Sequence, residues 1–135
     1  MQTLEIFGNE SANIVRARKG AHMSANRKHG NTYLSSDAKE LLFGKNVQAG
    51  RLLIVHSGIE NNWYLSKNND PKSGFECRLN DMKLQASMRV NGAQEVIEKM
   101  AQSFNHKGER IVFEVSDNPI QYQGMNLYKL TLINY

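Results

Sequence analysis

The feature that most constrains the fold is an order of local signals that occurs twice along the chain. In each occurrence, the residues indicate in order a strand, a polar cap, a short helix, a glycine with a basic residue, an apolar strand, a turn and a further strand. The helical segments correspond, because Ala-Lys-Glu-Leu-Leu at residues 38–42 is similar to Ala-Gln-Glu-Val-Ile at residues 93–97. Together with one additional strand that precedes each unit, the pattern predicts two pseudo-repeats at approximately residues 12–67 and 74–133.

Local chemistry predicts where the helices begin and end. Ser36 or Asp37 can accept hydrogen bonds from backbone N–H groups at the start of the first helix, and Gly44 can end it. Asn91 is the predicted cap of the second helix, along which apolar residues recur at helical spacing. The two-residue alternation within residues 110–116 predicts a half-buried strand.

These signals predict one α+β domain that spans residues 1–135, with a largely antiparallel sheet and two helices. After a first strand at residues 4–7, the expected order is ββα–ββββ–αββ. The additional strands that open the two units are expected at residues 13–16 and 74–78. A chain of 135 residues that is 40% hydrophobic and 22% charged has the size and composition of one folded domain.

Positive charge is concentrated in residues 16–30, which read RARKGAHMSANRKHG. This stretch holds five basic residues and no acid, whereas the whole chain has 17 basic and 13 acidic residues. Removing five from 17 leaves 12 basic residues against 13 acidic ones, so the stretch accounts for the net charge of +4. A local basic patch indicates an anionic partner. Within it, we expect residues 20–30 to form a flexible hairpin tip or a strand pair whose cations contact phosphates; the alternative is a solvated loop.

The predicted nucleic-acid contacts combine these cations with aromatic side chains, on which bases can stack. Trp63 and Tyr64 are neighbours on a predicted strand, so they face opposite sides and only one of them can join the core. We expect one of the two to be a stacking platform. The complete predicted site consists of Arg16, Arg18, Lys19, Arg27, Lys28, His29, Trp63, Tyr64 and Lys67. Arg51, Lys72 and Arg78 extend the basic patch if the fold brings them near it.

The residue types that support catalysis or cofactor binding do not form recognisable patterns in this sequence. It has no glycine-rich phosphate loop, its four histidines are scattered, and no pair of its acids stands out as a general acid/base or two-metal site. Its one cysteine, Cys77, cannot form an internal disulfide and is expected as a small buried residue within a strand. We therefore expect a non-enzymatic protein that has no cofactor, no metal and no catalytic residues.

The apolar runs of the sequence are short. The longest, residues 52–55, falls far below the ~20 residues that a membrane-spanning helix needs. The first ten residues lack the basic and apolar regions of a secretory signal. With a single cysteine, these features predict a cytoplasmic protein that does not bind membranes.

The predicted order of elements resembles that of the PC4, PUR and Whirly proteins, as a cyclic shift of a twice-repeated ββββα unit. Those proteins bind single-stranded nucleic acid on curved antiparallel sheets backed by helices, and the resemblance covers most of the chain as topology. A second, local resemblance spans residues 32–55, which look like the half-hairpin of AbrB-type DNA-binding dimers. In place of that family's Ile-Pro opening and Gly-Asp turn, this chain has Tyr33-Leu34-Ser35 and Gly50-Arg51. Both resemblances imply a nucleic-acid partner.

The sequence therefore predicts a small nucleic-acid-binding protein whose partner is DNA or RNA, with single strands favoured. The alternative is a protein–protein interaction module, such as an adaptor or an inhibitor of a host protein encoded by a phage or another mobile element. In that alternative the basic stretch docks on an acidic protein surface. The oligomeric state stays open between a monomer and a homodimer.

Overall fold

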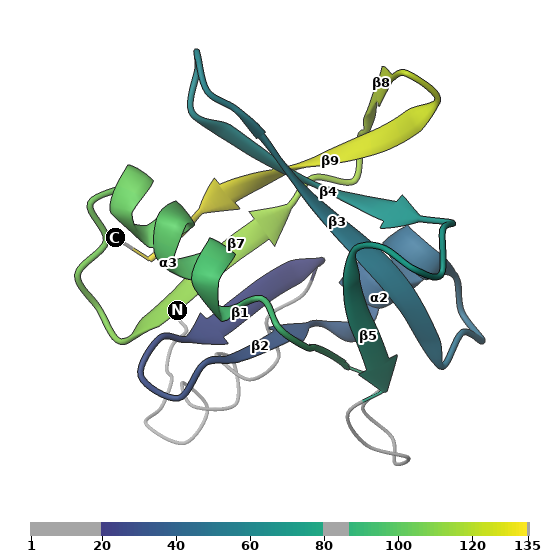
Figure 1. The fold of residues 1–135 in the computed structure, drawn as a ribbon, viewed down its shortest axis with the longest axis horizontal. Helices are drawn as coiled ribbons and strands as arrows, with labels where there is room; N and C mark the ends of the chain where they lie inside the picture. The colour runs from purple at the N-terminus through teal and green to yellow at the C-terminus, as the bar shows by residue number, and fades with distance from the viewer. Residues whose placement is uncertain (1–19, 80–86, 135) are drawn as a thin grey trace, which may run out of the picture.

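The computed structural model of the chain describes residues 20–79 and 87–134. The elements, in chain order, are β1 (His22–Asn26), β2 (Asn31–Leu34), α2 (Ser36–Phe43), β3 (Ala49–Ser57), β4 (Asn62–Asn68), β5 (Phe75–Leu79), β6 (Met88–Val90), α3 (Gln94–Ser103), β7 (Arg110–Val115), β8 (Ile120–Tyr122) and β9 (Met125–Leu132). In Figure 1, α3 lies at the left and α2 at the right, with the strands crossing between them.

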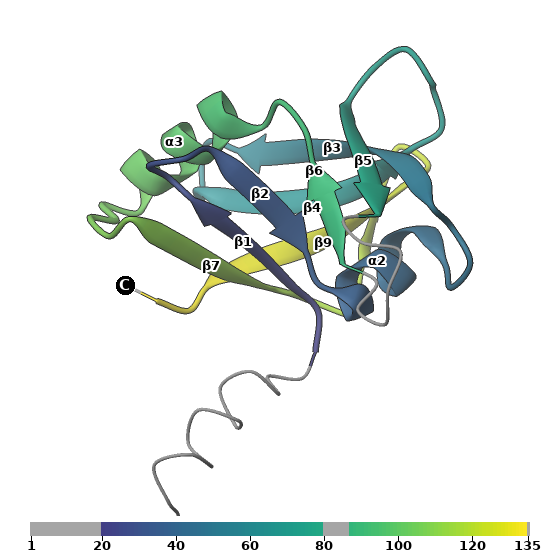
Figure 2. The same ribbon diagram turned by 90° about the horizontal axis from the view of Figure 1, so that it is seen from below.

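Eight of the strands form a closed barrel, because β4 pairs with β9 as well as with β3. The order around the ring is β4-β3-β5-β6-β2-β1-β7-β9, and β8 pairs with β9 in addition. Every described strand pair is antiparallel. Figure 2 shows β5, β6, β2, β1 and β7 side by side in one wall of the ring. The predicted α+β class, with an antiparallel sheet and two helices, is confirmed within the described residues.

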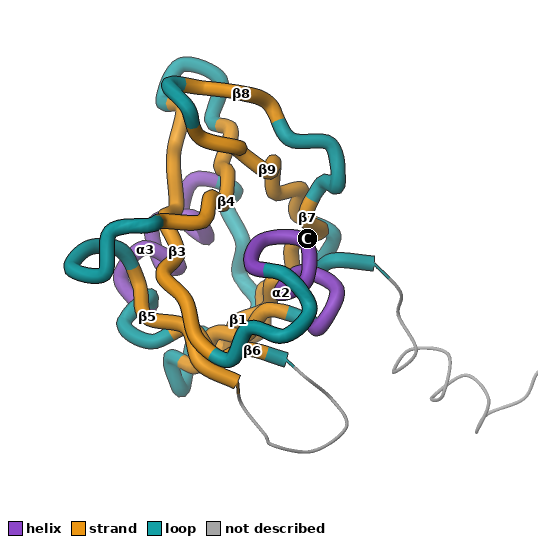
Figure 3. The backbone as a smooth tube through the Cα atoms, turned by 90° about the vertical axis from the view of Figure 1, so that its right-hand side faces the viewer, coloured by secondary structure: helices purple, strands orange, loops and turns teal. Residues whose placement is uncertain are grey.

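The two helices lie on opposite sides of the strands, as Figure 3 shows. The hydroxyl of Ser35 caps α2 by accepting a hydrogen bond from the N–H of Ala38 at 3.2 Å, so the cap lies one residue before the predicted one. Gly44 ends α2 as predicted, with a φ of 104° that side-chain-bearing residues rarely adopt. Ala93 precedes α3 and no side chain caps this helix, so the prediction of Asn91 as its cap was wrong. Within residues 20–79 and 87–134, no helix has the length and apolar character needed to cross a membrane.

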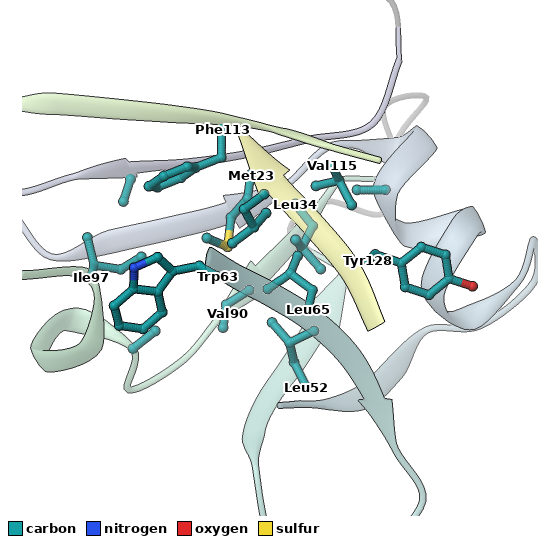
Figure 4. Packing of buried hydrophobic residues seen from close by; sticks show 14 of the residues in the cluster. Met23, Leu34, Leu52, Trp63, Leu65, Val90, Ile97, Phe113, Val115 and Tyr128 are labelled. Atoms are coloured by element: carbon teal, nitrogen blue, oxygen red, sulfur yellow. The ribbon is translucent and has the colours of Figure 1, made fainter. Parts of the chain in front are cut away.

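The core fills the interior of the ring, where alternate residues of each strand point inward. Figure 4 shows Met23, Leu34, Leu65 and Phe113 packed together, and all four are fully buried. In β7 the residues at the inward positions of the predicted alternation are buried, while Arg110 and Glu114 are exposed. The alternation predicted for residues 110–116 is therefore present, except that Val112 on the outward side is also buried.

Two strands appear where the sequence did not clearly indicate them. β1 has the sequence HMSAN, which contains none of the β-branched or aromatic residues that favour strands. β8 is three residues long, and all three side chains are exposed. The strands predicted at residues 4–7 and 13–16 lie outside the described residues.

Candidate functional site

The basic stretch at residues 16–30 divides into parts with different environments. Arg16, Arg18 and Lys19 lie outside the described residues. The middle of the stretch is β1, where Met23 and Ala25 are core residues. β1 pairs with β2 on one side and β7 on the other, so residues 22–34 form a strand pair within the barrel wall. Residues 20–30 therefore contain a strand of this pair and the tip of its hairpin, the turn at residues 27–30.

Arg27, at the end of β1, binds acceptors of the protein itself. Its Nε lies 3.0 Å from Oε2 of Glu98 and its Nη2 lies 3.1 Å from Oε1, which is a bidentate ion pair with α3. Its Nη1 donates to the carbonyl oxygens of His106 at 2.8 Å and Gly108 at 3.0 Å. The hydrogen bonds between the two side chains raise the pKa of Arg27 and lower that of Glu98. Arg27 therefore joins the β1–β2 turn to α3 and the loop before β7, and few of its donors are left for a phosphate.

Lys28 and His29 occupy the tip of the β1–β2 turn. Both side chains are exposed, and both backbone N–H groups donate to Oδ1 of Asn26 at 3.0 Å. The Asn26 carboxamide thus fixes the backbone of the turn. The two side chains extend into solvent and are free to meet a partner.

Trp63 and Tyr64 face opposite sides of β4, as expected from their adjacency. Trp63 points into the core and is only 5% exposed, while Tyr64 is half-buried on the outer side. The ring of His56 stacks on the indole with a centroid distance of 3.9 Å. The indole Nε1 donates to Oδ1 of Asn61 at 3.2 Å and to Oγ of Ser103 at 3.1 Å. Because Trp63 is enclosed in this way, Tyr64 is the residue of the two that can stack on a base.

Three arginines form a row on the outer wall of the barrel, and we call Arg51, Arg78 and Arg89 the arginine row. Arg78 on β5 lies directly opposite Arg89 on β6, and Arg89 lies opposite Tyr33 on β2. Arg51 on β3 is two residues along from Ala49, which is the partner of Arg78. Side chains two residues apart on a strand share a face, so all three arginines point outward. The inward neighbours Cys77, Met88 and Val90 confirm this orientation, since all are buried.

One carboxylate interrupts the positive charge of the arginine row. Glu76 lies opposite Arg51, and its Oε2 is 2.9 Å from Nη2 of Arg78. The hydrogen bond and charge of Arg78 lower the pKa of Glu76, and Arg51 acts in the same direction. Arg78 nevertheless keeps 66% of its side-chain surface exposed. The row therefore carries a net positive charge on a solvent-facing surface.

The remaining contacts of the arginine row are to neutral acceptors. Nη1 of Arg51 donates to the carbonyl oxygen of Gly74 at 3.2 Å, and Nη2 of Arg89 donates to Oδ1 of Asn31 at 3.3 Å. Guanidinium groups have five N–H donors each, so these single bonds leave donors available. An anion that bridges two arginines would also relieve the repulsion between like charges that lie directly across a strand pair.

The sequence indicates part of the arginine row. Arg51 and Arg78 were expected as possible extensions of the basic patch, together with Lys67, which is exposed at the end of β4. Arg89 was not expected at the site, because residues 84–90 contain too few cations to stand out. Its outward position on a predicted strand next to the strand of Arg78 is the signal that could have identified it.

Cys77 is buried in the core. Burial raises the pKa of the Cys77 thiol to about 12, so it stays protonated at neutral pH. No three histidine, cysteine or carboxylate side chains among the described residues are grouped so that they could hold a metal ion.

No protein-family model, curated protein or solved structure matches the chain.

Proposed function

We propose that this protein binds nucleic acid without catalysing a reaction, and that it does so in the cytoplasm. The observation that carries the proposal is the direct opposition of Arg78 and Arg89 on an exposed barrel wall, with Tyr33 beside them. Arginine contacts the phosphate backbone with charge-assisted hydrogen bonds, and an adjacent ring offers a surface for a base. Lys28, His29 and Lys67 are exposed at other points of the barrel and extend the positive surface.

The proposed ligand is a single strand of DNA or RNA. Tyr33 is half-buried and lies between Ser24 and Arg89 on the outer wall, so its ring stands beside a cation. Bases of a single strand are free to stack on such a ring, whereas the bases of a duplex already stack on one another. The combination of cations and a ring on one face therefore favours single strands.

We also propose that the chain consists of two pseudo-repeats, and the strand pairings support this. In the proposed correspondence, β1 matches β5, β2 matches β6, β3 matches β7 and β4 matches β9. Exchanging the members of each match converts the pair β1–β2 into β5–β6, the pair β1–β7 into β3–β5, and the pair β3–β4 into β7–β9. The same exchange leaves β2–β6 and β4–β9 unchanged. A pairing scheme of this kind is expected if two copies of one unit stand in for the two subunits of an AbrB-type dimer.

Direct binding measurements test the proposed function. Fluorescence anisotropy with labelled oligonucleotides, single-stranded and duplex, is measured at low and high salt. We expect binding at low salt that weakens steeply as salt increases, because each neutralised phosphate releases counterions. The absence of binding at low salt, or an affinity indifferent to salt, would contradict the proposal.

A protein partner is the second candidate, and exposed apolar side chains favour it. Ile59, in the β3–β4 turn, is 98% exposed, and Ile120 and Tyr122 on β8 are 51% and 53% exposed. Exposed large apolar side chains are common in protein interfaces. Capture of a protein partner that persists after nuclease treatment and is lost on Ile59→Ser substitution would favour this function over nucleic-acid binding.

A further inference from the structure

The barrel opens locally where β4 and β9 separate. The two strands pair only at Trp63, Tyr64 and Leu65, opposite Leu130, Lys129 and Tyr128. The following residues of β4 and the preceding residues of β9 border a pocket of about 260 Å³. Figure 4 shows the ring of Tyr128, which lines this pocket, at the edge of the core beside α2. The pocket thus occupies the gap that the diverging strands leave in the wall.

The lining of the pocket combines polar groups with an apolar surface. Lys67 and Asn69 contribute an ammonium and a carboxamide, and Leu42, Met125 and Tyr128 contribute apolar surface. Asn126 contributes a second carboxamide, whose Oδ1 accepts a hydrogen bond from Nε2 of Gln121 and whose Nδ2 is left to donate. None of the lining residues is acidic. Within the described residues, Nζ of Lys67 and the carboxamide of Asn69 have no hydrogen-bond partner in the protein. A ligand with an anionic group and a small flat body that both donates and accepts hydrogen bonds matches this chemistry.

One residue that lines the pocket is the direct cross-strand neighbour of the arginine row. Asn68, on its rim, lies directly opposite Arg51 on β3, and Lys67 is the next residue along β4. The carboxamide of Asn68 is used within the protein, because its Nδ2 donates to Ser73 Oγ at 2.7 Å and to the Ser73 carbonyl oxygen at 3.0 Å. Asn68 therefore shapes the rim, and Lys67 and Asn69 are the groups on this side that can bind a ligand.

We infer that the pocket receives one unstacked nucleobase of a bound single strand, with Lys67 contacting the adjoining phosphate. This inference rests on the proposed function and adds the position at which the protein holds one base. The pocket is smaller than the ~300–1,000 Å³ typical of sites for drug-sized ligands, so it has room for one base and not for a stacked pair. Asn69 and Asn126 contact the edge of the base, and Tyr128, Leu42 and Met125 contact its body.

The first test uses nucleoside 5′-monophosphates and the ¹⁵N-labelled full chain. We expect uridine or adenosine monophosphate to shift the side-chain amide signals of Asn69 and Asn126 in NMR spectra, and inorganic phosphate alone not to do so. Met125→Trp, which fills the pocket, should abolish these shifts, and Lys129→Ala, on the exposed side of β9, should retain them. Shifts that are absent, or that inorganic phosphate reproduces, overturn the inference.

The second test uses oligonucleotides and exposed residues whose substitution leaves the core intact. Removing one base from a short single strand should weaken binding about 5- to 150-fold at one position of the strand, the effect of losing one stacked base. Lys67→Ala/Asn69→Ala should remove that position dependence, whereas the matched Lys99→Ala/Asn118→Ala variant should keep it. If oligonucleotides bind but every position responds alike, the pocket inference fails and the proposed function stands. If the wild-type chain binds no oligonucleotide, both fail.

Discussion

Arg78 on β5 and Arg89 on β6 lie directly opposite each other on the outer wall of the barrel. Two like charges in this position repel. Glu76 offsets part of the charge through its contact with Arg78, while Arg89 has only the carboxamide of Asn31 as a described hydrogen-bond partner. A polyanion lying along the strands would turn this unfavourable pair into a binding surface.

Substitution of Arg27 should affect stability and not binding. Arg27→Ala removes a bidentate contact to Glu98 and two bonds to backbone carbonyls, so we expect a loss of about 1–3 kcal/mol in the free energy of unfolding. Lys28→Ala, at the exposed tip of the same turn, should change it by less than ~0.5 kcal/mol. Urea unfolding of the two variants measures the difference. Equal stability of the two would contradict the structural role of Arg27.

The ion pair of Arg27 and Glu98 should also make stability depend on pH. Because the folded-state pKa of Glu98 is lowered, its contribution is present above the ordinary pKa of a glutamate and is lost as pH falls through the folded value. We expect the melting temperature of the wild-type chain to fall more between pH 7 and pH 3 than that of Glu98→Gln. Parallel curves for the two proteins would show that the ion pair does not stabilise the fold.

The stacked pair of His56 and Trp63 gives a spectroscopic prediction. Trp63 is the only tryptophan of the chain and is enclosed by His56, Asn61 and Ser103. We expect His56→Ala to shift the tryptophan emission to longer wavelength and to increase its quenching by acrylamide, because one face of the indole becomes accessible to water. His29→Ala serves as the control and should leave the emission unchanged. Unchanged emission in His56→Ala would mean that the histidine does not cover the ring.

Local patterns in the sequence predict the elements but not their closure into a ring. The alternation in residues 110–116 and the glycine at position 44 act over a few residues, and both features are present in the structure. The composition of β1 favours a strand only weakly, and its pairing with β2 and β7 places it in the barrel wall. The closure between β4 and β9 joins residues far apart in sequence, for which composition gives no signal.

The candidate site follows the same division. The opposite orientations of Trp63 and Tyr64 follow from their adjacency on a strand, which the sequence displays. The ion pair of Arg27 with Glu98 does not follow from any local pattern, because Glu98 is 71 residues away in the chain. The arginine row depends on the pairing of β5 with β6 and β3, so its three members become neighbours only in the folded chain.

The salt dependence of oligonucleotide binding by Arg78→Ala/Arg89→Ala tests the central claim most directly. Lys99→Ala/Lys107→Ala, which removes two exposed charges near α3, serves as the matched control. Both variants should fold with unchanged melting temperatures, since the substituted side chains are exposed. We predict that the arginine variant binds single strands more weakly, and that its slope of log affinity against log salt is less steep by about 1.4, the effect of two lost phosphate contacts. A wild-type slope and affinity in the arginine variant would contradict the account.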